Sequence, residues 1–268
     1  FHERSNGFRP NRSTEHAIAQ CCRLMQIQHL HYAVDLDIHG FFDNVNHTRL
    51  MKQLWNIGIK DKRVLAIVGK MLKAPIKGKD IPTCGTPQGG ILSPLLSNVV
   101  LNDLDWWISN QWETFPSRYK YSRDGNLHVA LKTTGLKEMY IVRYADDARI
   151  FAKTHKSAVR IYHAVRGYLE NQLKLEISPE KSKITNLRRR RSEFLGFEMK
   201  VVLKRKQYVT NTFVSRKSKE KIKQEIRQRI KEIQQNPNHK LIMNYNSYIL
   251  GIRNYYETAS HVHIDFAE

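Results

Sequence analysis

Cysteine is scarce in this sequence, and long apolar runs are absent from it. The chain of 268 residues has three cysteines, and Cys21 and Cys22 are neighbours that make a poor disulfide pair. We expect Cys21, Cys22 and Cys84 to be reduced, small hydrophobic side chains, as in a cytoplasmic protein. No apolar run approaches the ~20 residues that span a bilayer, and no signal peptide is visible. These absences argue against a disulfide-stabilised secreted domain and predict no membrane partner.

Acidic residues are also few relative to basic ones. The chain has 45 Lys and Arg against 25 Asp and Glu, a formal net charge of +20. The excess is concentrated between Lys181 and Glu232, where eighteen basic residues face five acidic ones. A surface that serves only solubility mixes the two signs, so this stretch favours a nucleic-acid-binding track over a merely solvated face. With 41% apolar residues, the chain has enough material for one sizeable core with subdomains.

Two of the acidic residues stand together between β-prone segments. Tyr140, Val142 and Tyr144 alternate with other residues, and the pattern resumes after Asp146-Asp147 through Phe151. This alternation predicts a strand, a tight turn and a second strand, with the two aspartates in or beside the turn. A solvent-exposed turn rich in aspartate is the plain alternative.

A third carboxylate lies upstream at the end of another predicted strand. Tyr32, Val34, Leu36 and Ile38 alternate with Asp35 and Asp37. If this strand joins the same sheet, Asp37 meets Asp146 and Asp147. Hard carboxylate oxygens in this arrangement suit Mg²⁺, and two such ions about 3.5–4 Å apart can promote an in-line phosphoryl displacement.

Several motifs in order resemble those of a known family. Tyr144-Ala-Asp-Asp147 resembles the active-site box of reverse transcriptases, and Asp37-Ile-His-Gly-Phe-Phe-Asp43 resembles its first catalytic aspartate followed by an aromatic sugar gate. Thr86-Pro-Gln-Gly-Gly-Ile-Leu-Ser-Pro-Leu-Leu96 is similar to the next box in the form typical of group II intron-encoded reverse transcriptases, or maturases. Further matching stretches, in the expected order, are Gly7–Pro10, Ile177–Lys183, Phe194–Phe197 and Tyr245–Tyr256.

The resemblance implies an α+β right-hand polymerase fold with palm and fingers on an antiparallel sheet, followed by a helical thumb. We expect partial fingers in residues 1–30, the palm with finger elements in 31–210, and an incomplete thumb or maturase domain in 211–268. The implied function is an RNA-directed DNA polymerase with two Mg²⁺ ions. Its implied partners are an RNA template such as intron RNA, a DNA or RNA primer, and dNTPs. The chain begins at Phe1 close to the first family-like box, so a fragment of a longer protein is expected.

The resemblance also implies roles for individual residues around the reaction. Metal binding falls to Asp37, Asp146 and Asp147, with the Ile38 carbonyl as an extra ligand. Lys181 resembles the lysine that neutralises or protonates the departing pyrophosphate, although a phosphate-tracking lysine is nearly as good a reading. The residues expected to bind the nucleotide are Arg9, Gln88, Gly89 and, as sugar gate, either Phe42 or its neighbour Phe41.

Nucleic-acid contacts are expected along the fingers, the basic stretch and the thumb. In the thumb, a basic helix over 215–235 is predicted to dock through Ile222, Ile226 and Ile230 and to end at Asn236-Pro237. The composition of residues 104–138 predicts a helix end followed by a loop or hairpin. The sequence does not indicate the role of this segment. The residues expected to bind nucleic acid are Arg12, Lys183, Arg188, Arg189, Phe194, Leu195, Gly196, Lys219, Lys223 and Arg227.

Two other functions stay open at the level of sequence. One is an RNA-binding splicing maturase whose catalysis is idle. The other is a reverse transcriptase outside an intron, of the phage-defence type. The three aspartates favour an active polymerase, and the Gln88-Gly-Gly90 box with the maturase-like thumb favours the intron type.

Overall fold

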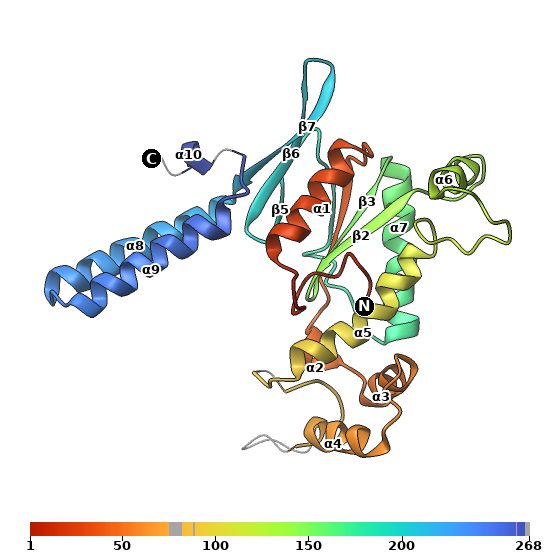
Figure 1. Ribbon diagram of the computed structural model, residues 1–268, viewed down its shortest axis with the longest axis horizontal. Coiled ribbons are helices and arrows are strands. Elements are labelled where there is room, and N and C mark those ends of the chain that lie inside the picture. Colours follow the sequence, from red (N-terminus) through yellow and green to blue (C-terminus); the bar gives the residue numbers. More distant parts are fainter. Residues whose placement is uncertain (75–81, 88, 261, 266–268) are drawn as a thin grey trace. The chain divides into compact units, whose positions relative to one another are not determined.

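The computed structural model describes residues 1–74, 82–87, 89–260 and 262–265 (Figure 1). The chain forms two compact units. The first contains residues 1–24 and 28–185, and the second contains residues 25–27 and 186–268. Gln88, which was expected to bind the nucleotide, lies outside the described residues.

The first unit is built on a four-stranded sheet in the order β2-β3-β1-β4. Both β2 and β1 pair with β3 in antiparallel fashion, with Tyr144 opposite Asp147 and Leu36 opposite Ala148. The predicted strand, turn and second strand are therefore confirmed, as is the antiparallel sheet that joins them to the strand before Asp37. The strands are β1 (Tyr32–Leu36), β2 (Met139–Tyr144), β3 (Asp147–Ala152) and β4 (Lys183–Asn186).

Two helices pack together on this sheet. Helix α5 (Ser93–Ser109) contacts β2, and α7 (His155–Tyr168) contacts β1 and β3. The Trp107 and Tyr168 rings stack at 4.4 Å between centroids, which places α5 and α7 side by side. Helix α7 continues into a π-helical turn, Leu169–Leu173. The apolar side chains of both helices join the strands in one buried core.

One of the other helices of this unit was not predicted from the sequence. The helix end predicted after Leu104 is confirmed at Ser109, but the loop or hairpin predicted for the rest of residues 104–138 is wrong in part, because it contains a separate helix, α6. The polar and aromatic composition of this segment hid a helix with little apolar periodicity. The remaining helices are α1 (Thr14–Gln26), α2 (Phe41–Asn44), α3 (His47–Asn56), α4 (Lys62–Leu72) and α6 (Asp124–Lys132).

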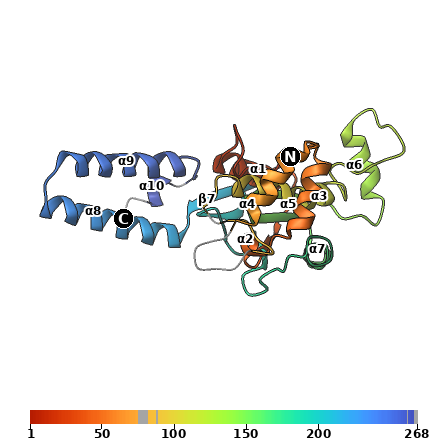
Figure 2. The ribbon, with the colours of Figure 1, turned by 90° about the horizontal axis from the view of Figure 1, so that it is seen from below.

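The second unit combines a three-stranded sheet with a pair of helices. The strands run in the order β5-β6-β7, and α8 and α9 run side by side (Figure 2). Helix α8 begins after Ser215, whose hydroxyl accepts a hydrogen bond from the Ser218 amide, and it ends before Asn236 as predicted. The elements are β5 (Ser192–Phe194), β6 (Phe197–Lys204), β7 (Gln207–Val214), α8 (Arg216–Gln235), α9 (His239–Tyr256) and α10 (Val262–Asp265).

The predicted apolar stripe of α8 holds only in part. Ile222 is buried and Ile226 is half-buried, but Ile230 is exposed. Helix α9 likewise exposes Ile242 and Leu250. Two helices cover only part of each other's apolar surface, so the stripe predicted from periodicity is longer than the surface that packs. Among the described helices, none is long and apolar enough to cross a membrane.

Candidate active site

The two adjacent aspartates lie at the hairpin between β2 and β3. Tyr144 pairs with Asp147, so Ala145 and Asp146 form a two-residue turn. Ala145 has φ of +57°, in the left-handed region that costs a residue with a Cβ about 1–2 kcal/mol. Two-residue hairpins require such backbone angles, and glycine or asparagine usually supplies them. An alanine here needs support from its surroundings.

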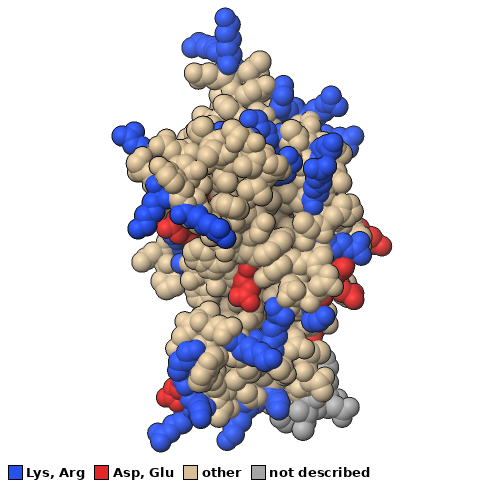
Figure 3. All heavy atoms as spheres, turned by 90° about the vertical axis from the view of Figure 1, so that its right-hand side faces the viewer, with Lys and Arg blue, Asp and Glu red and all other residues tan. Residues whose placement is uncertain are grey.

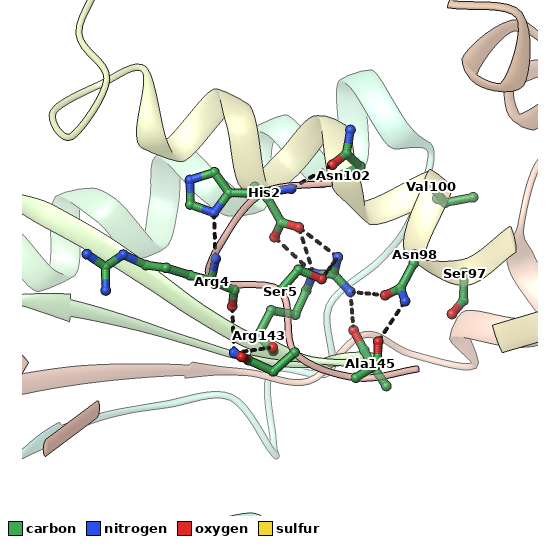
Figure 4. Close-up of polar contacts among 12 residues, drawn as sticks. His2, Arg4, Ser5, Ser97, Asn98, Val100, Asn102, Arg143 and Ala145 are labelled. Atoms are coloured by element: carbon green, nitrogen blue, oxygen red, sulfur yellow. Dashed lines mark hydrogen bonds and ion pairs between the residues drawn. The ribbon is translucent and has the colours of Figure 1, made fainter. Parts of the chain in front are cut away.

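A buried arginine supplies that support (Figure 4). The Arg143 side chain is fully buried, and its Nε and Nη2 donate to the two oxygens of Asp105 at 2.9 and 2.6 Å. Its Nη1 donates to the Ala145 carbonyl at 2.5 Å and to Asn98 Oδ1 at 2.9 Å, and Nη2 also donates to Ser5 Oγ at 2.8 Å. A buried charge is tolerated only when it is paired and hydrogen-bonded, and Arg143 meets both conditions. Arg143 thereby holds the carbonyl that precedes Asp146.

The N-terminal segment closes over the same turn. Ser5 forms a parallel bridge with Arg143, and the Asn6 amide donates to the Arg143 carbonyl at 2.8 Å. Asn98 Nδ2 donates to the Gly7 carbonyl at 2.7 Å. A Cβ on Gly7 would lie 2.3 Å from the Ala145 nitrogen, closer than any real contact. The glycine of the first family-like box is therefore required by close backbone approach to the turn.

Asp37 comes to the same end of the sheet. Because Leu36 lies opposite Ala148 in the β1–β3 pair, continuing the register places Asp37 opposite Asp147. Partial burial of its carboxyl, together with the charges of Asp146 and Asp37, raises the pKa of Asp147 from 3.8 to about 6. Lys181 Nζ lies 3.8 Å from Asp37 Oδ2. The structure thus brings together the four residues expected to be catalytic.

These carboxylates fit hard, oxygen-binding cations that keep water and substrate oxygens as ligands. In the part of the chain that the structure describes, no three His, Cys, Asp or Glu side chains are arranged to hold a metal ion by themselves. Mg²⁺ seldom uses such all-protein cages and is bound by one or two carboxylates plus phosphate oxygens. No described donor reaches the Ile38 carbonyl, whereas the neighbouring Asp37 carbonyl accepts from the Ser178 amide at 2.8 Å. The donor set therefore suits Mg²⁺ with phosphate.

The two adjacent phenylalanines differ in their surroundings. Phe41 is buried, with 3% of its surface exposed, and belongs to the core. Phe42 is half-buried and lines a cavity of about 440 Å³ together with Gly89, Gly90, Ser93 and Pro94. Gly89 has φ of +81° and no atom within 4 Å of the place a Cβ would take, so a ligand can approach its backbone. Of the two rings, Phe42 is the one that lines an open cavity.

Not every basic residue expected at the site is available for a ligand. The Arg9 guanidinium donates to the His2 and Ser5 carbonyls at 2.6 and 2.8 Å, which ties it to the N-terminal loop. Arg12 is half-buried. Lys219 Nζ lies 2.5 Å from Asp265 Oδ1 in the second unit. An ion pair of this kind competes with a phosphate for the ammonium.

The second unit contains the expected hairpin. Leu195 and Gly196 turn the chain between β5 and β6, with φ of +52° and +77°. The Tyr255 hydroxyl donates to the Leu195 carbonyl at 3.0 Å, and Phe194 is buried. The Arg188 guanidinium lies 4.9 Å from the centre of the Tyr208 ring. Lys183, Arg189 and Arg227 are exposed, and Lys223 is half-exposed.

Sequence reasoning missed Arg143, Asp105 and Asn98. The available signal was a charge within an otherwise apolar strand and an acid between Leu104 and Trp106 of an apolar helix. Such isolated charges are rarely buried unless they are paired. Periodicity alone does not show that these two meet.

Comparison with known proteins gives concordant results. The family model described as reverse transcriptase (RNA-dependent DNA polymerase) matches residues 1–199. The chain is 30% identical over 239 residues to Protein YkfC of Escherichia coli K12, covering 82% of this chain and 61% of YkfC. It is 31% identical over 242 residues to the group II intron-encoded protein LtrA of Lactococcus lactis subsp. cremoris, covering 75% of this chain and 40% of LtrA.

Two further similarities are more distant or more partial. A putative COX1/OXI3 intron 2 protein of Saccharomyces cerevisiae is 31% identical over 232 residues, covering 74% of this chain and 27% of that protein. The chain thus spans less than two thirds of the length of these relatives. An apo telomerase structure from Candida tropicalis superposes with a TM-score of 0.48 and 11% identity, covering 73% of this chain and 35% of that one.

Proposed function

The chain belongs to the reverse transcriptase (RNA-dependent DNA polymerase) family, and on that premise we propose that it extends the 3′-hydroxyl of a primer on an RNA template. Its substrates would be dNTPs and a DNA or RNA primer annealed to the template. It is related to group II intron-encoded proteins, and we propose that it acts as a reverse transcriptase of that type. The proposal concerns this chain and not the longer relatives that it partly covers.

The observation that supports catalysis most directly is the meeting of three carboxylates at one end of the sheet. Asp37 lies opposite Asp147 when the β1–β3 register is continued, and burial of the Asp147 carboxyl together with the charges of Asp146 and Asp37 raises its pKa to about 6. Carboxylates that are held close together and repel each other favour the binding of cations. In the proposal, Asp37, Asp146 and Asp147 hold two Mg²⁺ ions, with the Ile38 carbonyl as an added ligand. When bound, the ions favour ionisation of the primer hydroxyl and stabilise the charge of the triphosphate and pyrophosphate.

The chain's own side chains would then orient the substrates. Lys181 is 74% exposed, and its ammonium can leave Asp37 to meet the departing pyrophosphate. Phe42, at the wall of the cavity that Gly89 also lines, would exclude a ribose 2′-hydroxyl. Base pairing with the template would select the nucleotide. Gln88 completes the proposed nucleotide-binding set.

The basic residues of the second half would bind the template and primer through phosphates. We assign partial fingers to residues 1–30, the palm with finger elements to 31–210 and the thumb to 211–268. The hairpin at Leu195–Gly196 would contact the primer end. Phosphate contacts carry no sequence information, so they suit an enzyme that copies many templates. The residues proposed for this track are Arg12, Lys183, Arg188, Arg189, Lys219, Lys223 and Arg227.

Binding of intron RNA is the second part of the proposal. Several of the matched proteins are named as intron-encoded or intron proteins. A splicing maturase with idle catalysis would bind such RNA but would not extend a primer. The two candidates therefore differ in one measurement, the synthesis of DNA.

Primer extension on RNA tests the proposal. With Mg²⁺ and dNTPs, the chain should extend an annealed primer, and extension should stop when Mg²⁺ is omitted. Phe42→Ala should increase ribonucleotide incorporation relative to deoxynucleotides, whereas Phe41→Ala should act mainly on stability because Phe41 is buried. RNA binding without any extension by the unaltered chain would favour the idle maturase. Unchanged discrimination in Phe42→Ala would remove the sugar gate from this residue.

A further inference from the structure

A second concavity in the first unit gathers positive charge away from the aspartates. It has a volume of about 360 Å³. Its walls come from three separate segments: Trp112, the end of α6 with the loop that follows it, and Lys153–Arg160 at the start of α7. Only one acid, Glu138, is among its lining residues. The basic residues that line it are Lys132, Lys137, Lys153, Lys156 and Arg160.

The position of this concavity separates it from the catalytic turn. Strand β3 begins at Asp147 and ends at Ala152, and Lys153 follows directly. Six residues of strand span about 17–20 Å, so the two sites lie at opposite ends of β3. A primer end held at Asp147 therefore does not occupy the space beside Lys153.

The five cations have no internal partner. None of their side chains forms an ion pair or hydrogen bond with a residue that the structure describes. Lys132, Lys153, Lys156 and Arg160 are exposed, whereas Trp112 and Ser157 on the inner wall are buried. On the face that lies to the right in Figure 1, Lys and Arg side chains are spread widely and acidic ones are few (Figure 3). Five like charges around one hollow repel each other, and a bound anion would relieve that repulsion.

The start of α7 adds to the same field. Thr154 caps this helix of 14 residues by accepting a hydrogen bond from the Ser157 amide at 3.2 Å. Thr154, Lys156 and Ser157 all line the hollow. The positive end of the helix dipole therefore lies against the cationic side chains. The hollow thus combines mobile ammonium groups with the positive end of the α7 helix dipole.

We propose that this hollow, the α6–α7 pocket, binds phosphate groups of a single-stranded nucleic acid that is distinct from the template–primer at the catalytic turn. Its volume accommodates a phosphate with its sugar and not the width of a duplex. Lysine side chains contact phosphates and carry no information about the base. The lysines of this hollow therefore fit phosphate recognition that is independent of sequence. The inference rests on membership of a polymerase family for the class of polyanion, and it does not require the chain to be catalytically active.

Binding of a second strand in the presence of saturating template–primer tests the proposal. The probe is a fluorescently labelled, unstructured RNA of 12 nucleotides, added to the 268-residue chain already saturated with an unlabelled blunt hairpin template–primer. Fluorescence anisotropy should show that this second strand binds. The variant Lys153→Gln, Lys156→Gln, Arg160→Gln should weaken its binding at least tenfold. Its salt dependence, as the slope of log K against log salt, should fall by about 2, since each phosphate on a single strand contributes ~0.7.

A matched variant separates this pocket from general charge. Lys52→Gln, Lys62→Gln, Arg63→Gln removes the same charge from exposed positions on α3 and α4. It should change second-strand affinity less than threefold. A second pocket variant, Lys132→Gln with Lys137→Gln, removes cations from the opposite wall and should weaken binding in the same direction. All five pocket substitutions are at surface side chains, and thermal unfolding should confirm an unchanged fold.

Four results would overturn the proposal. These are no second-strand binding by the saturated chain, an equal loss in the α3–α4 variant, an equal loss of affinity for the hairpin template–primer in the pocket variant, and displacement of the strand by inorganic pyrophosphate as readily as by unlabelled RNA. The last result would assign the pocket to free phosphates. Second-strand binding by a chain that extends no primer would contradict the proposed function alone and leave this inference standing.

Discussion

Two of the hairpins that turn through a residue other than glycine in the left-handed region, β2–β3 and β5–β6, are held in different ways. Ala145 is fixed by Arg143 and Gly7, and Arg143 is in turn held by Ser5 and Asn6; all four are buried. Leu195, at the tip of the β5–β6 hairpin, is held by the hydroxyl of Tyr255, which is 40% exposed. The first turn presents two carboxylates that must keep a set geometry. The second is proposed to follow a primer, and neutral hydrogen bonds hold it, one from the exposed Tyr255 and one from the Ser215 amide to the Gly196 carbonyl at 2.9 Å.

The largest effect is expected at Arg143. Arg143→Met leaves Asp105 buried without its partner, which should cost about 3–5 kcal/mol of stability. The double variant Arg143→Met, Asp105→Leu should recover most of that loss, because an apolar pair can replace a buried ion pair. Primer extension should stay low in the double variant, since the Ala145 carbonyl lacks its donor. Thermal unfolding and single-turnover extension are the two measurements.

That pair of variants distinguishes positioning from stability. If the double variant regains both stability and extension, the arginine contributes only to folding. If the rate constant of extension falls while the apparent affinity for dNTP is retained, the turn has lost its geometry.

Gly7→Ala is expected to have the next largest effect. The new methyl group would meet the Ala145 nitrogen at 2.3 Å, and relief requires displacement of the turn or of the N-terminal segment. Overpacking of this kind costs about 1–3 kcal/mol. The matched control is Gly167→Ala within α7, where the nearest atom lies 3.9 Å away and alanine should stabilise the helix by about 0.5–1 kcal/mol. Equal unfolding temperatures for the two variants would contradict the close contact at Gly7.

A smaller effect is expected at the second hairpin. Tyr255→Phe removes the hydrogen bond to the Leu195 carbonyl while keeping the ring, and should cost about 0.5–1 kcal/mol or less because water can replace it. Amide hydrogen exchange should accelerate at residues 194–197 and remain unchanged at residues 144–147. Unchanged exchange at the β5–β6 hairpin would show that the tyrosine does not restrain it.

A pH dependence of stability is expected from Asp147. Its pKa of about 6 in the folded chain exceeds the 3.8 of an ordinary aspartate, so the folded state binds this proton more tightly than the unfolded state. The stability that this bound proton contributes to the folded state is complete below pH 3.8 and is lost as pH rises through 6. In metal-free buffer, Asp147→Asn should therefore gain stability over the unaltered chain between pH 4 and 7. Unfolding temperatures that track each other over this range would contradict the raised pKa.

Much of this site could be predicted from the sequence, but the residues that hold the turn in place could not. Alternation around Asp37 and Asp146-Asp147 predicted the strands and the turn, and the ordered motifs predicted the α+β reverse transcriptase fold, which is confirmed. These features follow from local pattern. The Arg143–Asp105 pair joins residues 38 positions apart, and the Gly7 contact depends on packing of the N-terminal segment. Such long-range pairings have no local signal.

The errors have the same origin. Helix α6 lacks strong apolar periodicity and was predicted as a loop or hairpin. Ile230 was assigned to a docked stripe from its spacing, yet its side chain is 39% exposed. Lys219 stays in the proposed phosphate track, but its charge alone did not predict that Asp265 Oδ1 lies 2.5 Å from its ammonium. Composition predicts a partner class well and individual contacts poorly.

Single-nucleotide primer extension by Asp147→Asn tests the central claim most directly. The claim is that the carboxylates at the β2–β3 turn carry the chemistry of DNA synthesis. Asp147→Asn should abolish extension on an RNA template in Mg²⁺ while template–primer affinity stays within a few-fold. Asp61→Asn, which keeps a residue able to cap α4, is the matched control and should extend normally. Substantial extension by Asp147→Asn would contradict the assignment of this turn as the active site.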